Sequence, residues 1–288
     1  MPDAAPVTRT VPTRRISFDE LDQVPRSFAR SENVILCHLT AMMSAMFPDG
    51  EDFFVRSVRH YRDQITDPEL KRQVTGFIGQ ESVHGREHRA FNRRLAELGY
   101  PTHRMERLTR RSLALRERVV PPIGNLALTA ALEHFTATLA ELVLSNEASR
   151  AEFGHPAVLD LFLWHALEES EHKAVAFDVY RAVGGSERTR IWTMQVLRFG
   201  FVVWTSLAVA LSLAGDRATY RRGNLRRCWR ELRRSPLVQR DVWLTLRDYC
   251  RRDFHPDDHD NRELLDQWRE TLFGDHGTLV GKLATPAA

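Results

Sequence analysis

The chain has 288 residues, 43% hydrophobic and 27% charged, and this composition excludes a disordered or collagen-like protein. Its three cysteines are too far apart for a disulfide framework or a cysteine zinc site, which favours a reducing, cytoplasmic compartment. The net charge is only +3, but residues 217–252 contain 12 arginines and three acidic residues. The rest of the chain is therefore acidic, by about six charges.

Apolar residues recur with helical spacing along almost the whole chain, and no segment alternates as a strand does. The sequence therefore predicts an all-α protein. The first helix is expected over 31–45, with Ser31 as its N-cap. Pro48 is expected to break or kink the chain over 48–50, and a second helical stretch is expected over 51–65.

Asp67 and Pro68 are a typical helix start, and the helix that they open is expected to run to Gly99. Further helices are predicted over 108–119, 123–149, 156–183 and 187–214, with two or three arginine-rich amphipathic helices within 217–273. The expected domains are a flexible arm (1–17), a ferritin-like four-helix bundle (18–186), additional C-terminal helices (187–273) and a tail (274–288).

Two of the predicted helices carry the pattern Glu-x-x-His within an apolar stripe. At 100° per residue, each set of acidic and imidazole side chains spans about 60° of its helix, so each points inward. The sets are Glu81, His84 and His88 on one helix and His165, Glu169 and His172 on the other.

Glu51 and Glu133 lie in apolar stripes on the other two long helices, without a cation beside them. Buried carboxylates protonate, form ion pairs or bind metal, and no Lys or Arg lies on these inward faces. Two divalent ions are the simplest compensation. One Glu from each of two helices and Glu-x-x-His from each of the other two is the ligand pattern of ferritin-like di-iron bundles. The predicted metal ligands are Glu51, Glu81, His84, Glu133, Glu169 and His172.

Several alternatives stay open. The cluster could be a polar network without metal, and Asp52 could replace Glu51 as a ligand. His88 and His165 are either additional ligands or hydrogen-bond partners of the ligands. His165 and His172 lie about 10 Å apart along an ideal helix, too far to share one ion without a local bulge. Three neighbours of the cluster are expected to face solvent or form salt bridges: Glu87, Glu168 and Glu171. His134 is expected to be structural.

Four segments resemble the bacterial family catalogued as predicted metal-dependent hydrolases, over about residues 15–270. They are FPDGEDFF (47–54), QESVHGREH (80–88), ALEH (131–134) and EESEHK (168–173). The ligand order also resembles that of ferritin-like di-iron oxygenases, and the spacing of His165, Glu169 and His172 is similar to the extra-histidine helix of arylamine N-oxygenases. The latter likeness implies that His165 is a third histidine ligand.

The resemblance to di-iron oxygenases implies that an iron pair activates O2 and oxidises a small molecule beside Glu81 and Glu169, which would be bridging carboxylates. The carboxylate-rich set suits iron, with manganese or zinc as alternatives. No dinucleotide or flavin motif is visible, so an external electron donor or reductase is expected. The first alternative function is hydrolysis by water that the metal activates. The second is metal binding or storage without catalysis.

The most apolar stretch of the chain, 199–214, precedes the arginine-rich segment, and between residues 191 and 215 only Arg198 is charged. A buried helix is expected there. The alternative is attachment to a membrane surface, because the arginines could meet anionic headgroups and the uncharged stretch is short for a full span. No recognition motif indicates nucleic acid. The substrate is expected to be a small, hydrophobic molecule, and a homodimer is one candidate oligomeric state.

Overall fold

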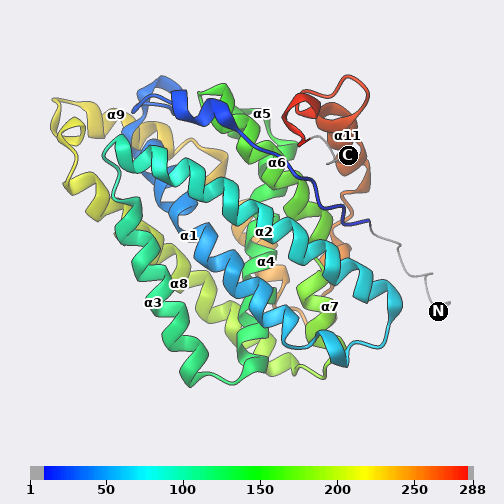
Figure 1. Cartoon of the computed structure of the whole chain (residues 1–288). Helices are drawn as coiled ribbons and strands as arrows, with labels where there is room; N and C mark the ends of the chain where they lie inside the picture. The colour runs from blue at the N-terminus through cyan, green and yellow to red at the C-terminus, as the bar shows by residue number, and fades with distance from the viewer. Residues whose placement is uncertain (1–9, 285–288) are drawn as a thin grey trace.

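The computed structural model describes residues 10–284, which form helices and, as their one extended pairing, an isolated β-bridge between Ile16 and Leu283 (Figure 1). The all-α prediction is confirmed. The helices that carry the candidate ligands are long and lie beside one another. They are α1 (Val34–Arg59), α2 (Pro68–Glu97), α4 (Pro122–Ser145) and α6 (Pro156–His172).

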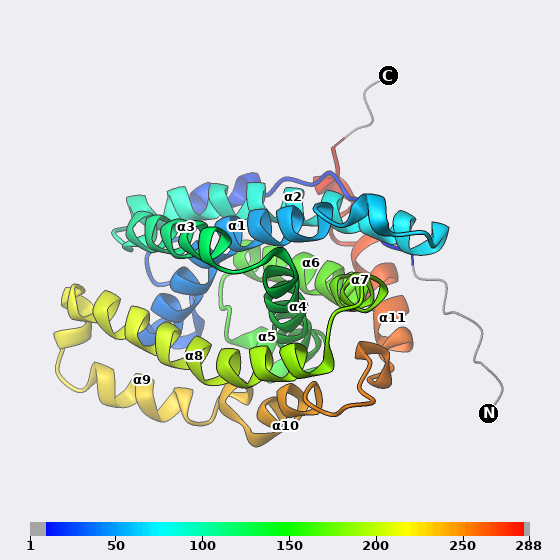
Figure 2. The same ribbon diagram turned by 90° about the horizontal axis from the view of Figure 1, so that it is seen from below.

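In this central group α1 packs along α2 and α4 packs along α6, while the pairs α1 and α4, and α2 and α6, also touch (Figures 1 and 2). Two apolar cores fill the space between the helices. One contains Phe91 and Trp164, and the other contains Phe53, Phe77 and Tyr180. The helices form a bundle, and its ferritin-like classification stays a prediction.

The first long helix differs from its prediction, because α1 is continuous through Pro48. A proline at this position removes the N–H that would donate to the Ser44 carbonyl. The side-chain amide of Asn92 on α2 donates to that carbonyl instead, at 3.1 Å. The helix begins after Asn33, whose side chain accepts from two backbone N–H groups, rather than at Ser31.

The second helix agrees with its prediction. Asp67 caps α2 by accepting from the backbone N–H of Glu69, and Gly99 follows the helix with a φ of +90°, a conformation that glycine adopts without strain. Beyond it, α3 (Thr102–Val119) begins six residues earlier than expected.

Two of the later predicted helices are each divided in the structure. Asn146 caps a short α5 (Glu147–Ala151) after α4, and the segment expected over 156–183 consists of α6 and α7 (Val175–Ala182). A tertiary contact that the local sequence does not show lies at the division after α6. The buried Lys173 donates to the side chain of Asn261, at 3.0 Å, from the C-terminal part of the chain.

The C-terminal helices are α8 (Glu187–Ala214), α9 (Asn224–Leu232), α10 (Arg240–Asp248) and α11 (Arg262–Phe273). One side of α8 packs on α1 and α4, and its outer side faces solvent. The expectation that this apolar helix is buried is therefore wrong. By length and hydropathy, α4 and α8 could each cross a membrane, but α4 is mostly buried in the protein, whereas only 17% of the apolar window of α8 is buried.

Both terminal segments are more structured than predicted. Residues 1–9 and 285–288 of the expected arm and tail lie outside the described residues. Within residues 10–17, Ile16 is buried and Arg14 forms ion pairs with α6, so this part is not a flexible arm. Leu279 is fully buried, and the backbone of the C-terminal segment pairs with that of the N-terminal one. Each segment is held by contacts with a segment distant in sequence.

Candidate metal centre

Four helices bring the predicted ligands into one buried cluster. Each of its side chains belongs to a residue that is at most 5% exposed. Ligand atoms lie within 4.8 Å of one another in four overlapping sets of three. The sets are Glu81, Glu133 and His172; Glu51, Glu81 and His84; His84, His165 and Glu169; and Glu51, His88 and His165.

Glu81 and Glu169 lie between two imidazoles from different helices. Glu81 Oε1 is 3.1 Å from His172 Nε2 and 3.6 Å from His84 Nδ1. The two oxygens of Glu169 lie 3.5 Å from His84 Nδ1 and 3.6 Å from His172 Nε2. This is the arrangement that bridging carboxylates require, and the bridging role itself stays a prediction.

Outer hydrogen bonds determine which nitrogen of His172 faces the cluster. Gln80 donates through Nε2 to the Pro12 carbonyl and to Glu171, at 3.0 and 2.9 Å. Its Oε1 is therefore an acceptor, so His172 Nδ1 donates to it, at 2.9 Å. The inner Nε2 of His172 is left to bind a proton or a metal ion. His84 is oriented similarly, because its Nε2 donates to Glu168 at 3.0 Å and its Nδ1 faces the glutamates.

A longer chain of hydrogen bonds orients His165. Asn92 Nδ2 donates to the Ser44 carbonyl and to Glu106, so Asn92 Oδ1 accepts from the Ser44 hydroxyl, at 2.7 Å. The hydroxyl then accepts from His88 Nδ1, at 2.9 Å, and His88 Nε2 accepts from His165 Nδ1, at 2.6 Å. Burial lowers the pKa of both histidines, which are therefore neutral. His165 Nε2 consequently faces Glu169 Oε1, at a hydrogen-bond distance of 2.9 Å.

His165 and His172 need not bind the same ion, although both lie on α6. The two imidazoles belong to different sets of three donors, so no helix distortion is needed. His165 directs Nε2 at the glutamates of the cluster, as a ligand does, whereas both nitrogens of His88 are engaged in the chain to Ser44 and His165. We therefore place His165 among the candidate ligands and His88 outside them.

The charges within the cluster are poorly compensated by the described residues. Within the described residues both oxygens of Glu51 accept no hydrogen bond, and the imidazoles of His84 and His172 are the nearest cationic groups to Glu81 and Glu133. Burial raises the pKa of Glu133 to about 8, and burial together with the charge of Glu81 raises the pKa of Glu51 well above its usual value. Convergent buried carboxylates and inward-facing imidazole nitrogens fit divalent cations.

Protons take the place of cations in the metal-free chain. Burial would lower the pKa of His84, but hydrogen bonds to Glu168, Glu169 and Glu81 outweigh burial and raise the pKa well above the usual value. The pKa of His172 is raised in the same way, against burial, by the charges of Glu133 and Glu169. Metal ligands must be deprotonated, so metal must displace these protons.

Sequence reasoning gave salt bridges as one alternative for Glu168 and Glu171 but did not identify their partners, which form an outer layer of ionic contacts. Glu168 and Glu171 are fully or almost fully buried, so the alternative that they face solvent is wrong and the salt-bridge alternative is confirmed. Arg14 pairs with Glu168 at 3.0 Å and with both oxygens of Glu171, and Arg269 also pairs with Glu171. The run of acidic residues around the second Glu-x-x-His pattern indicates that these side chains need basic partners. The partners, Arg14 and Arg269, are distant in sequence and could not be identified from it.

The remaining predicted neighbours have clear positions. Asp52 is exposed and pairs with Arg89, so it does not replace Glu51. His134 contacts the Thr245 carbonyl through Nε2 at 3.1 Å, as expected of a structural residue. Glu87 is buried, pairs with Arg86 and accepts from the backbone N–H of Phe18.

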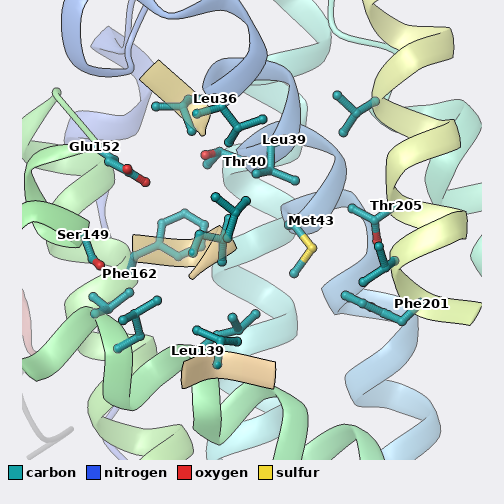
Figure 3. Close-up of a pocket in the computed structure, with 18 of the residues that line it drawn as sticks. Leu36, Leu39, Thr40, Met43, Leu139, Ser149, Glu152, Phe162, Phe201 and Thr205 are labelled. Carbon is teal, nitrogen blue, oxygen red and sulfur yellow. The ribbon is translucent and has the colours of Figure 1, made fainter. Parts of the chain in front are cut away.

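An apolar cavity of about 730 Å³ extends from the cluster between α1, α4, α6, α8 and α9 (Figure 3). His165 and Glu169 are the cluster residues that line it. Figure 3 shows the walls, which include Leu36, Met43, Leu139, Phe162 and Phe201. The volume suits an apolar molecule of drug-like size.

The fold and the cluster define an all-α protein with a buried site suited to metal. The chain belongs to the family described as "Predicted metal-dependent hydrolase", whose profile matches residues 12–260. This match includes every candidate ligand. Comparison with curated proteins and with solved structures finds no significant match.

Proposed function

We propose that the chain is a hydrolase that uses a dinuclear metal centre to cleave a small apolar molecule, such as an ester of a long-chain acid. The observation that carries this proposal is the buried set of unpartnered carboxylate and imidazole atoms at the inner end of the apolar cavity. The family description supports hydrolysis as the reaction.

The sets of donors suggest how two ions would be held. Glu133 and His172 would hold one ion, and Glu51, His84 and His165 would hold the other, with Glu81 and Glu169 shared. When bound, divalent ions would supply water activated at neutral pH and would polarise a carbonyl oxygen.

The chain's own residues would bind and orient the substrate. The apolar walls would hold the acyl part and exclude bulk water from the cluster. Phe47 packs against the rings of His88 and His165, with centroids 4.8 and 5.0 Å away, and narrows this inner end. Glu169 lines the cavity, so the substrate would meet the cluster at this side chain.

Oxidation by O2 at an iron pair is the second candidate function. The ligand order along the four helices matches the template associated with that chemistry. The cavity also offers few polar groups that could hold a scissile carbonyl, and a C–H bond would need none. An external electron donor would be required.

The test begins with metal-free chain loaded separately with zinc, manganese or, without air, iron. Each form is assayed for hydrolysis of p-nitrophenyl esters of increasing acyl length and, with a chemical reductant, for O2 consumption. The proposal predicts metal-dependent ester hydrolysis that Glu81→Ala abolishes. The matched control is Glu97→Ala, which removes an exposed carboxylate from the same helix.

Two results would contradict hydrolysis. Ester cleavage that persists in Glu81→Ala would show that the cluster does not catalyse it. Iron-dependent O2 consumption without ester cleavage by any metal form would favour the second candidate.

A further inference from the structure

The outer side of α8 is an uncharged apolar stripe. Six large apolar side chains, each 51–68% exposed, follow one another along the helix over about a third of its circumference. The stripe consists of Trp192, Val196, Phe199, Val203, Leu207 and Leu211. A stripe of this length on a described surface indicates an apolar partner.

An arginine cluster follows the stripe directly, over 217–234. Seven exposed arginines in this segment form no salt bridge within the described residues: Arg217, Arg221, Arg222, Arg226, Arg230, Arg233 and Arg234. Tyr220 and Trp229, 70% and 54% exposed, lie among them. Aromatic and basic side chains at the end of an apolar face are typical of a membrane interface.

The cavity reaches the surface beside the stripe. Val202 on α8 and Leu225 and Trp229 on α9 line the cavity and are 36–54% exposed. Figure 2 shows α8 and α9 together along one side of the molecule. The exposed part of the cavity lining therefore lies on the flank of α8 next to the stripe and on α9, within the arginine cluster, and we call these exposed surfaces of α8 and α9 together the docking face.

We propose that this face docks on an anionic lipid bilayer and that the cavity takes its substrate from that bilayer. The stripe would enter the acyl boundary while the arginines meet anionic headgroups. The helix would lie along the surface rather than cross it, because Met194, Thr205 and Val209 pack inward on its other side. The docking needs only this face, whereas the substrate's origin rests on the proposed function.

A bilayer fits the face better than a second copy of the chain does. The exposed arginines would pair best with a surface of dense negative charge, such as anionic headgroups. The α8 stripe of a second copy of the chain has no acidic side chain that could pair with them. A protein partner on this face would also cover the cavity opening, whereas a bilayer would supply apolar molecules to it.

Co-sedimentation with vesicles tests the docking on the full chain, with and without metal. Val203→Glu should lower the partition coefficient for phosphatidylcholine–phosphatidylglycerol vesicles at least about tenfold, because a charge replaces an apolar contact. Val280→Glu is the matched control, since Val280 is 40% exposed and belongs to the C-terminal segment. Figure 1 shows that segment, in red, across the molecule from α9.

The electrostatic part is tested in the same assay. Replacing both Arg226 and Arg230 by Gln should weaken binding about thirtyfold, and added salt should weaken wild-type binding. The control replaces two exposed arginines by Gln: Arg59, the last residue of α1, and Arg62, three residues beyond it. Docking is overturned if the wild type does not bind the vesicles, or if Val203→Glu binds them as well as the wild type does. It is also overturned if the stripe instead holds two copies of the chain together, so that Val203→Glu dissociates a dimer and the dimer itself does not bind vesicles.

Ester hydrolysis tests the origin of the substrate separately. Val203→Glu should slow cleavage of a long-chain ester embedded in anionic vesicles and leave cleavage of a short soluble ester unchanged, because Val203 does not line the cavity. Equal rates for wild type and variant on the embedded ester would overturn this half. Vesicle binding without cleavage of either ester would overturn the proposed function and support docking.

Discussion

Gln80 offers a selective way to perturb one half of the proposed centre. Its fully buried side chain accepts from His172 Nδ1 and donates to the Pro12 carbonyl and Glu171. The change Gln80→Met keeps the approximate shape and removes these three hydrogen bonds. His172 then loses the acceptor that determines which of its nitrogens faces the cluster.

The expected effect on metal affinity follows from the role of such outer partners. Their loss typically weakens binding 10- to 100-fold, which is about 1.4–2.7 kcal/mol. The loss should be largest at the ion beside His172, because His84 and His165 are oriented by direct hydrogen bonds to other residues, Glu168 and His88. The free energy of unfolding should also fall by about 1–3 kcal/mol, because buried polar groups lose their partners.

Competition with a chelator during metal loading measures the affinity of each ion, and urea unfolding measures stability. Gln73→Met is the matched control, because Gln73 is a buried glutamine on the same helix whose side chain donates to Glu69, away from the cluster. Unchanged affinity for both ions in Gln80→Met, or the same loss in Gln73→Met, would refute the role of Gln80.

Three further predictions concern the ionic layer, the protons and the cavity. Arg14→Met should lower the free energy of unfolding in urea by about 3 kcal/mol, because it removes an ion-pair partner from Glu168 and Glu171. Replacing the exposed Arg15 by Gln should change this free energy by no more than about 0.5 kcal/mol, and the same loss in both variants would contradict the ion-pair argument. Metal loading should release protons, and metal affinity should therefore fall as the pH falls. The reason is that the metal-free chain holds protons on four of the candidate ligands, which are His84, His172, Glu51 and Glu133. Calorimetry in buffers of different ionisation enthalpy measures this release, and finding none would refute the prediction. Leu139→Trp should partly fill the cavity and slow cleavage of long-chain esters about tenfold relative to short ones at unchanged metal content, and equal slowing of both would place the substrate elsewhere.

The helices and the inward residues could be predicted from the sequence because both depend on local periodicity. Asp67, Pro68 and Gly99 set the ends of α2 through backbone chemistry that the sequence shows directly. The spacing of Glu81, His84, Glu169 and His172 placed each pair on one helix face, and the structure brings both pairs into one cluster.

Features that depend on tertiary contacts could not be predicted in this way. The continuity of α1 through Pro48 depends on Asn92, from another helix. The orientation of His165 depends on a chain of hydrogen bonds that ends at Asn92, and the ionic layer depends on Arg14 near the beginning of the chain. No local pattern marks residues that meet only after the helices pack.

The apolar helix α8 shows a second limit of sequence reasoning. An uncharged helix of this length is compatible with burial in a core, attachment to a bilayer or a full span. Hydropathy cannot separate these cases, because it does not show which neighbours cover the helix. In the structure α1 and α4 cover one side, and the outer side is exposed.

Metal stoichiometry tests the assignment of the cluster most directly. The metal-free chain is loaded, freed of excess ions and analysed by elemental mass spectrometry, together with Glu81→Ala and the control Glu97→Ala. We expect about two divalent ions per chain for the wild type and the control and fewer than one for Glu81→Ala, since Glu81 contributes to both halves of the cluster. No bound metal in the wild type, or the same stoichiometry in Glu81→Ala, would contradict a metal centre at these residues.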